Sequence, residues 1–316
     1  VQAQKSKDMV RIGTIEFFSS LDYYHDPSSE TAQFVRNVYG YLLVMNEHTG
    51  KFMPELAKSW KRINPTTIEF QLRDDVTFHT GNKLTADDIK DTIEYLANPK
   101  VRIRFKGRYN WVKKVEKLGD YKLRIIAKRP FSTDLHTIAY RFYFYDSKVL
   151  KSLKTPRDYG RVSASGTSIY KALSVDKNKG FLVERFAPAV GKWPHKTART
   201  KRIQSVPIPD RQTQVASLLT GRVDAVRSIT KEMEDNLKNH PDIRVTTVPS
   251  KQLIYITLDA AGRSQNKVFT DKRVRQAFFK AIPRTKIKKF FITGGGTAEL
   301  PDGVCFKANV ACGPST

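Results

Sequence analysis

Hydrophobic and polar residues follow two different periods between residues 67 and 97. Apolar residues alternate with polar ones over residues 67–73, which predicts a half-buried strand. Apolar residues then recur at helical spacing along one face of residues 86–97. Thr85 precedes Asp88 by three positions, the spacing of a capping box, so we expect a helix from residue 86 to about residue 97.

The same two patterns recur along the rest of the chain. Strands are predicted over residues 9–15, 180–185, 202–208, 243–248 and 253–258. Helices are predicted over residues 32–43, from Asp210 to a stop at Gly221, and over residues 231–239 and 271–282. Hairpins are predicted at residues 43–53 and 111–127. This alternation predicts an α/β fold with mixed sheets.

Two of these helices have apolar faces that we expect to be buried. The expected inward-facing residues are Val215, Leu218 and Leu219 in the helix after Asp210, and Val274, Ala277, Phe278 and Ala281 in the helix over residues 271–282. Pro283 is expected to end the second of these helices, because proline removes a backbone donor and clashes with the preceding turn.

The composition is that of an ordinary globular protein. The 316 residues suffice for two domains, and hydrophobic and charged residues make up 40% and 28% of the chain. No run of eighteen apolar residues occurs, so we expect no membrane-spanning segment.

The charge is unusual, because 56 Lys and Arg face only 31 Asp and Glu, giving a formal net charge of +25. Such a surface attracts polyanions, so a protein that binds nucleic acid or anionic lipid is the alternative hypothesis. The basic residues are spread along the chain and are not interleaved with aromatics as in a base-stacking platform. Nucleic acid is therefore not the expected partner.

Residue patterns typical of catalysis or metal binding are not found. The six histidines lack the spacing of a metal site, and no G-x-S-x-G motif occurs. Asp87 and Asp88 belong to the start of a helix rather than to a positioned acid pair. We expect no enzyme, no cofactor, no metal site and no catalytic residues.

One long stretch of the sequence resembles a known family. Residues 54–60 read P-x-L-A-x-S-W, and residues 70–88 read F-x-L-R-x-x-V-x-F-H-x-G-x-x-x-T-A-x-D. This order is similar to that of the family 5 extracellular solute-binding proteins, the peptide- and nickel-binding group. Further similar segments lie at residues 37–42, 221–224 and 269–284.

The resemblance implies a periplasmic-binding-protein-like fold with two lobes. Lobe I is expected over residues 1–250, with a small subdomain inserted at about 41–150, and lobe II over 251–316. Family members continue further, so the second lobe is expected to be incomplete in this chain. Closure is expected about a hinge at residues 248–252.

The resemblance also implies a function. We expect a monomeric periplasmic receptor that delivers a peptide or peptide-like small molecule to the membrane subunits of an ABC importer. Val1 to Ala3 look like the end of a signal peptide.

The family's ligand cleft suggests which residues contact the ligand. The segment from Phe17 to Pro27 matches a loop at the mouth of that cleft. The expected contacts are Ser19, Ser20, Tyr23, Tyr109 and Thr167 in lobe I, with Tyr255 beside the hinge. Tyr109 could equally belong to the core, and Trp111 is expected there. Residues 166–170 match a family turn whose glycines allow positive φ, although here the second Gly and the Pro are replaced.

The two cysteines, Cys305 and Cys312, lie close together in the sequence. A disulfide between them would close an eight-residue loop and contribute roughly 2.5 kcal/mol. We expect this disulfide in an exported protein, the alternative being two unpaired thiols or a redox pair, although the spacing is not C-x-x-C.

Overall fold

The contacts of the chain divide it into two compact units in the computed structural model, Val1–Ser228 and Ile229–Thr316. The structure describes residues 8–17, 19–46, 49–162, 164–193, 195–246 and 255–291. The unit boundary falls before residue 250, and the proposed limits of lobe I, its inserted subdomain and lobe II stay predictions.

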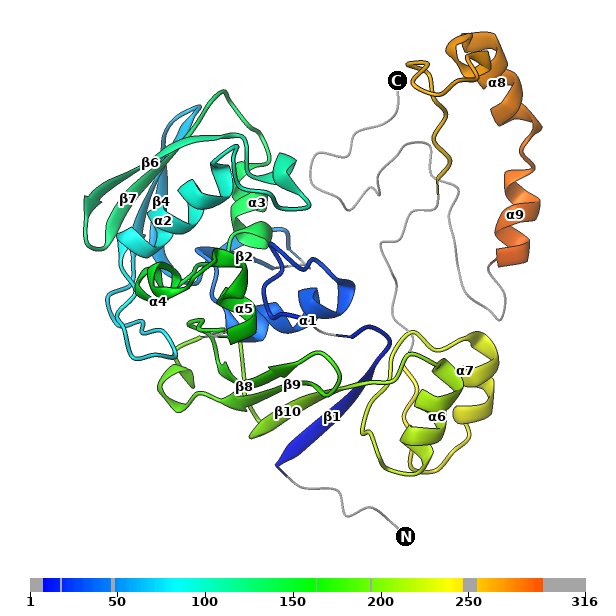
Figure 1. The fold of residues 1–316 in the computed structure, drawn as a ribbon, viewed down its shortest axis with the longest axis horizontal. Coiled ribbons are helices and arrows are strands. Elements are labelled where there is room, and N and C mark those ends of the chain that lie inside the picture. The colour runs from blue at the N-terminus through cyan, green and yellow to red at the C-terminus, as the bar shows by residue number, and fades with distance from the viewer. Residues whose placement is uncertain are drawn as a thin grey trace. The chain divides into compact units, whose positions relative to one another are not determined.

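A mixed four-stranded sheet forms one part of the first unit (Figure 1). Its order is β1-β10-β9-β8, in which β1 and β10 are parallel and the other neighbours antiparallel. The strands are β1 (Met9–Thr14), β8 (Tyr170–Asp176), β9 (Gly180–Arg185) and β10 (Arg202–Pro207). The predicted strands β1, β9 and β10 are confirmed, and so is the α/β class with a mixed sheet, whereas β8 was not predicted.

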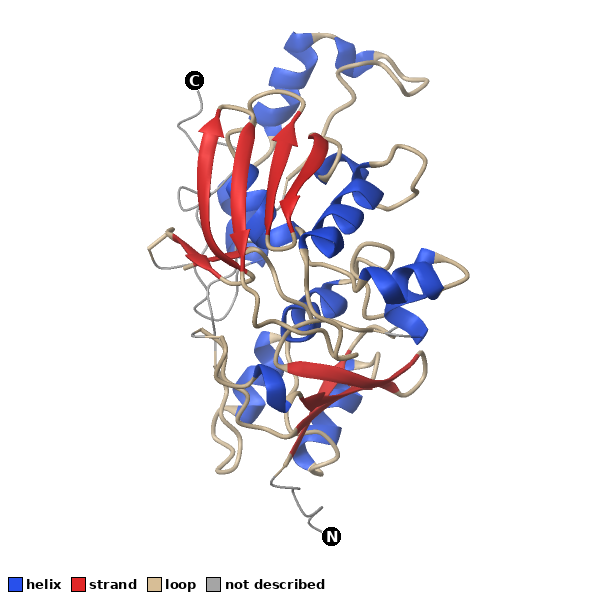
Figure 2. Ribbon diagram, turned by 90° about the vertical axis from the view of Figure 1, so that its left-hand side faces the viewer, coloured by secondary structure: helices blue, strands red, loops and turns tan. Residues whose placement is uncertain are grey.

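A second four-stranded sheet, fully antiparallel, is formed by the chain between β1 and β8 (Figure 2). Its order is β4-β5-β7-β6, from β4 (Ala57–Asn64), β5 (Thr67–Leu72), β6 (Val112–Gly119) and β7 (Lys122–Ala127). Helix α2 (Ala86–Ala97) packs on this sheet through Ile89, Ile93 and Leu96, which are fully buried. The strand and helix predicted over residues 67–97 are confirmed.

Both predicted hairpins are also confirmed. The first pairs β2 (Leu43–Met45) with β3 (Phe52–Pro54), and the second pairs β6 with β7. Besides α1, α2 and α6, the helices described in the first unit are α3 (Asp134–Arg141), α4 (Ser147–Ser152), α5 (Tyr159–Val162) and single turns at Lys106–Arg108, Pro156–Asp158 and Ala187–Ala189.

Helix α1 (Ser29–Val38) begins and ends earlier than the predicted residues 32–43. Ser28 caps its start by accepting a hydrogen bond from the Thr31 N–H. At its end, the Val38 carbonyl accepts from the Ser168 N–H at 3.0 Å, and Tyr39 adopts an extended conformation. The Ser168 N–H, which is distant in sequence, therefore occupies the Val38 carbonyl that would accept the next hydrogen bond of a longer helix.

Helix α6 (Arg211–Leu219) begins after the predicted cap, Asp210, whose side chain accepts from the Thr213 N–H. Its predicted stop is also confirmed, since Gly221 has a φ of 72°. The predicted apolar face is wrong at Leu219, which is 49% exposed, while Val215 and Leu218 are half-buried. The buried positions are instead Gln214 and Ser217. The Gln214 amide can be buried because it donates to the Ile208 carbonyl at 2.7 Å.

The second unit contains α7 (Lys231–Leu237), a turn at Val268–Thr270, α8 (Lys272–Ala281) and α9 (Arg284–Phe291). Helix α8 ends before Pro283, as predicted. The predicted strands at 243–248 and 253–258 are wrong in their described parts, residues 243–246 and 255–258, which are irregular. A strand needs a neighbouring strand to complete its hydrogen bonds, and no described strand pairs with these residues.

The apolar face predicted for α8 is not buried among the described residues. Phe278 is 36% exposed, Ala277 and Ala281 are exposed, and Val274 is half-buried. An amphipathic pattern shows which face a helix can bury, but it does not supply the surface that covers it.

No helix among the described residues is long and apolar enough to cross a membrane. The same residues contain no cluster of three or more His, Cys, Asp or Glu side chains with the geometry of a metal site.

Candidate ligand-binding site

The loop between β1 and α1, residues 15–28, contains three of the predicted ligand contacts. It turns at Asp26-Pro27, where the Asp26 N–H donates to the Asp22 carbonyl and the Ser28 N–H to the Asp26 carbonyl, each at 2.9 Å. The Ser19 hydroxyl donates to the Asp26 carboxylate and so closes the loop on itself.

Asp22 anchors this loop from inside the protein. Its carboxylate is fully buried and accepts hydrogen bonds from the Tyr143 hydroxyl at 2.7 Å and the Tyr24 N–H at 2.9 Å. The Nδ1 atom of His25 lies 2.5 Å from its other oxygen, and His25 Nε2 lies 2.9 Å from the Tyr95 hydroxyl. Burial, followed by the Asp22 charge, raises the pKa of Tyr95 to about 12. These bonds satisfy a carboxylate that would otherwise be costly to bury.

The Tyr24 hydroxyl forms two hydrogen bonds with the backbone of Tyr143. The Tyr24 hydroxyl donates to the Tyr143 carbonyl at 2.6 Å and accepts from the Tyr143 N–H at 2.9 Å. Their rings stack with centroids 4.1 Å apart. Because they are 119 positions apart in sequence, this pair ties the loop to the segment after α3.

Gly160, in α5, supports the loop from another side. Its carbonyl accepts from the Leu21 N–H at 2.9 Å, and a Cβ atom at this position would overlap Ser20 Oγ and Asp22 Cβ. The loop can therefore rest here only on a residue without a side chain. Sequence reasoning missed both Asp22 and Gly160 as determinants of the site.

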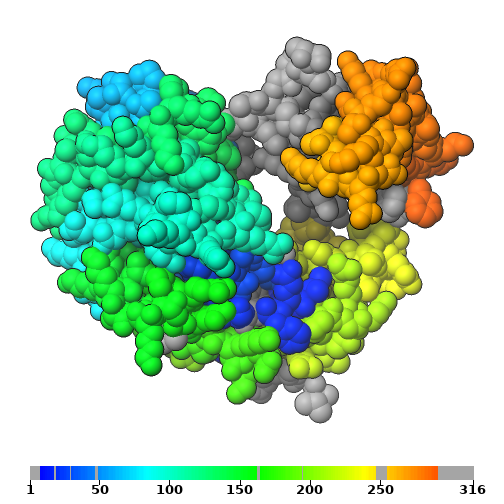
Figure 3. Space-filling view, turned by 45° about the horizontal axis from the view of Figure 1, so that its top comes forward, coloured from blue at the N-terminus to red at the C-terminus, as the bar shows by residue number. Residues whose placement is uncertain are grey.

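Part of this anchored loop is accessible to solvent. Phe17 is 50% exposed, and Ser19 and Tyr23 are half-buried. Figure 3 shows atoms of the N-terminal segment, in dark blue, on the surface of the first unit between its cyan and green parts. The combination of a fixed backbone with an aromatic and polar surface suits recognition of a small ligand.

The other predicted contacts are placed differently. Ser20 is buried and accepts from the Asp22 N–H at 3.0 Å. Tyr109 is also buried, and its ring packs edge-on against Tyr24 beneath the loop. Tyr255 belongs to the second unit and is 68% exposed. The structure thus brings Ser19, Ser20, Tyr23 and Tyr109 together, and their contact with a ligand stays a prediction.

Thr167 lies at the turn that follows α5, and its role as a ligand contact also stays a prediction. It is buried, and its hydroxyl accepts from the Gly40 N–H at 3.1 Å. The neighbouring Gly166 does not have the positive φ expected for this turn. Glycine is needed here for a different reason: a Cβ atom on Gly166 would overlap the Val38 carbonyl.

His79, from the F-H-x-G motif, fixes the same turn. Its Nδ1 accepts from the Gly166 N–H at 3.2 Å, and its Nε2–H donates to the Ser168 carbonyl at 2.9 Å. These partners together require the neutral imidazole with the proton on Nε2. Burial, and then the nearby Lys171 charge, lower the pKa of His79 to about 4.

A buried ion pair holds the loop after Trp193. Lys196 Nζ lies 2.7 Å from Glu55 Oε1 and also donates to the Arg36 carbonyl at 3.0 Å, while His195 Nε2 lies 3.3 Å from Glu55 Oε2. Burial alone would raise the pKa of Glu55, but Lys196 and His195 lower it below its ordinary value. This cluster stabilises the first unit, and both carboxylate oxygens of Glu55 are bound by partners within it.

Two further predictions lie outside the described residues. These are the hinge at residues 248–252 and the disulfide between Cys305 and Cys312.

Comparison with known proteins identifies the class. Residues 51–301 match the model of the bacterial extracellular solute-binding proteins, family 5 Middle. Among curated proteins, the glutathione-binding protein GsiB of Pectobacterium atrosepticum is 26% identical over 305 residues, covering 94% of this chain and 56% of GsiB. The chain belongs to the family 5 solute-binding proteins, and the resemblance seen in the sequence is confirmed.

Solved structures show the same fold. The oligopeptide-binding protein AppA from Bacillus subtilis, in complex with a nonapeptide, matches with a TM-score of 0.79 at 18% identity and covers 96% of this chain and 58% of AppA. NikZ from Campylobacter jejuni, in complex with Ni(L-His), matches with a TM-score of 0.76 at 22% identity and covers 90% and 55%. The chain therefore spans somewhat more than half the length of these relatives.

Proposed function

We propose that this protein is a receptor that binds a peptide or peptide-like small molecule and delivers it to an ABC importer. The observation that supports this most strongly is the anchored β1–α1 loop, which presents Phe17, Ser19 and Tyr23 on a backbone fixed by buried Asp22. Membership of the family supports the same function. A periplasmic location, a monomeric state and a hinge-closing mechanism are part of this proposal.

Within this proposal, the predicted residues have two roles. Ser19 and Tyr23 contact the ligand directly, because their side chains are only half-buried. Ser20, Tyr109 and Thr167 are buried. Ser20 and Tyr109 support the loop through the Asp22 N–H and the Tyr24 ring, and Thr167 holds the turn after α5 through the Gly40 N–H. Tyr255 is 68% exposed and is proposed as a contact from the second lobe.

Ligand binding can be tested with the full-length protein and two defined probes, glutathione and trialanine. Isothermal titration calorimetry is expected to show saturable binding of at least one of them. Native mass spectrometry of the freshly purified protein is expected to show a small-molecule adduct. Absence of both binding and adduct would contradict the proposal.

The site itself can be tested with Tyr23→Ala. Loss of an aromatic contact is expected to weaken binding of the responding probe about tenfold or more, because aromatic side chains dominate such contacts. Tyr121→Ala is the matched control, since Tyr121 is also half-buried but lies in the turn between β6 and β7. Equal weakening by the two variants would show that the effect is not local to the loop.

A further inference from the structure

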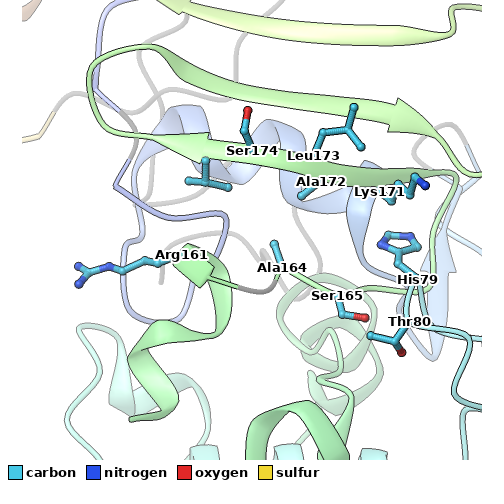
Figure 4. A pocket seen from close by; sticks show the side chains of 10 residues that line it. His79, Thr80, Arg161, Ala164, Ser165, Lys171, Ala172, Leu173 and Ser174 are labelled. Carbon is cyan, nitrogen blue, oxygen red and sulfur yellow. The ribbon is translucent and has the colours of Figure 1, made fainter. Parts of the chain in front are cut away.

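A pocket lies along β8, and none of the predicted ligand contacts line it. Its volume is about 240 Å³, and His79, Thr80, Ser165 and Lys171 lie at one end, with Arg161 at the other (Figure 4). This volume is below the range of roughly 300–1,000 Å³ typical of drug-sized ligands. The pocket therefore suits a small molecule or the end of a chain.

The charged side chains that line the pocket are both cationic. Its lining contains Lys171 and Arg161 but no Asp or Glu, and no described carboxylate lies within ion-pair distance of either cation. His79 adds no charge, because both of its ring nitrogens are used by backbone partners that require the neutral form.

Ser165 gives the pocket a buried hydroxyl group that is available to a ligand. The residue is 4% exposed, and its hydroxyl has no hydrogen-bond partner, which is unusual for a buried polar group. The neighbouring Thr80 hydroxyl is already used as a donor to the Asp146 carboxylate at 2.6 Å. In Figure 4 the Ser165 side chain points toward the end of the pocket where Thr80, His79 and Lys171 lie. An acceptor placed there would satisfy the free hydroxyl.

Backbone groups of β8 form one wall of the pocket. Residues 171–175 of β8 line it, and β8 is the edge strand of the mixed sheet. The outer N–H and C=O groups of an edge strand have no partner strand and can pair with an extended ligand. No other described strand occupies this edge.

We propose that this pocket binds an oxyanion, with the Lys171 ammonium group and the Ser165 hydroxyl as its donors. The anion is a carboxylate or a phosphate. A carboxylate at the end of a peptide would gain additional hydrogen bonds from the edge of β8, whereas an inorganic anion would not. The site is independent of the β1–α1 loop, since neither Ser19 nor Tyr23 lines it.

The test is an NMR titration of the ¹⁵N-labelled chain at constant ionic strength with acetate, phosphate, N-acetylglycine and N-acetylglycinamide. Saturable shifts are expected at the amides of Ser165 and residues 171–175 with the anions but not with the neutral amide. Tighter binding of N-acetylglycine than of acetate would identify a peptide terminus as the source of the carboxylate. Equal binding of acetate and phosphate would identify a simple oxyanion site.

Variants make the assignment specific. Lys171→Met is expected to weaken anion binding about tenfold and Ser165→Ala about threefold, as for the loss of a charged and a neutral hydrogen bond. Lys177→Met is the matched control, because it removes the same charge from the exposed turn between β8 and β9. Shifts spread over the whole surface, absence of saturation, or equal loss in Lys177→Met would overturn the proposal. None of these outcomes would affect the Tyr23 test of the peptide site.

Discussion

Gly160 lies against the loop that contains the predicted ligand contacts. Its backbone conformation is an ordinary one, so no unusual φ explains why glycine is needed. The reason is the closeness of Ser20 and Asp22, which leaves no room for a Cβ atom. Gly160 is therefore a positioning residue for the proposed site.

We expect Gly160→Ala to displace the loop. The overlap should reduce the free energy of unfolding by roughly 1–3 kcal/mol and weaken binding of the responding peptide probe. Gly107→Ala is the control, since no atom lies within 4 Å of a Cβ atom at that position. Denaturant unfolding and calorimetry check both effects, and unchanged affinity in Gly160→Ala would show that the loop does not depend on this contact.

His79 makes stability depend on pH. Its pKa of about 4 in the folded protein is below the ordinary value of 6.5, so the unfolded chain binds more protons between these values. The contribution of neutral His79 to the free energy of unfolding is therefore fully present above pH 6.5 and is lost as the pH falls toward 4. The size of the effect is about 3 kcal/mol.

His79→Gln should remove this pH dependence without removing the hydrogen bonds. A Gln amide can accept from the Gly166 N–H and donate to the Ser168 carbonyl, but it does not titrate. Urea unfolding between pH 7 and 4 is expected to show a shallower loss of stability in the variant. Parallel curves for variant and wild type would show that other groups cause the acid sensitivity.

At the scale of elements, Asp88 joins two helices. Its carboxylate accepts from the Thr85 N–H at 2.8 Å at the start of α2, and from the Ser147 N–H at 2.9 Å at the start of α4. The pattern of residues 85–88 predicted the first bond. The second could not be predicted, because it joins residues 59 positions apart.

Asp88→Ala is expected to destabilise the protein by about 2 kcal/mol, since it leaves two helix starts without their acceptor. Asp87→Ala removes the same charge from the adjacent position, where the side chain is exposed and pairs with Lys117 at 2.7 Å. That variant should change stability by less than about 1 kcal/mol. Thermal or urea unfolding compares the two, and similar losses would contradict the second role of Asp88.

At the scale of the whole molecule, the excess of positive charge is concentrated at the surface. Several of the 31 acidic residues are buried and bound within the first unit: Asp22, Glu30, Glu55, Asp88, Asp134 and Asp146. They serve as internal hydrogen-bond acceptors and ion-pair partners, as Glu30 does for Arg227 and Asp134 does for Arg62. Fewer acids therefore remain to balance the surface cations.

Salt dependence separates the proposed receptor from the alternative of a polyanion-binding protein. Binding of glutathione or trialanine is expected to change little between about 50 and 200 mM salt, whereas non-specific duplex DNA binding falls steeply over this range. Fluorescence anisotropy with labelled DNA and calorimetry with the peptide probes measure the two. Steeply salt-dependent DNA binding, with no binding of either peptide probe, would favour the polyanion-binding alternative instead.

The sequence determined the family, the strands β1, β5, β9 and β10, helix α2, both hairpins and the location of the loop. These follow from local periodicity, cap residues and motifs of fixed spacing, which act between residues close together in the chain. Tertiary structure decided the end of α1 at Val38, the buried polar face of α6 and the absence of strands at 243–246 and 255–258. It also separated the half-buried Ser19 and Tyr23 from the buried Ser20, Tyr109 and Thr167. Each of these outcomes depends on contacts between segments far apart in sequence, such as Ser168 on Val38 and Tyr143 on Asp22, which no local pattern contains.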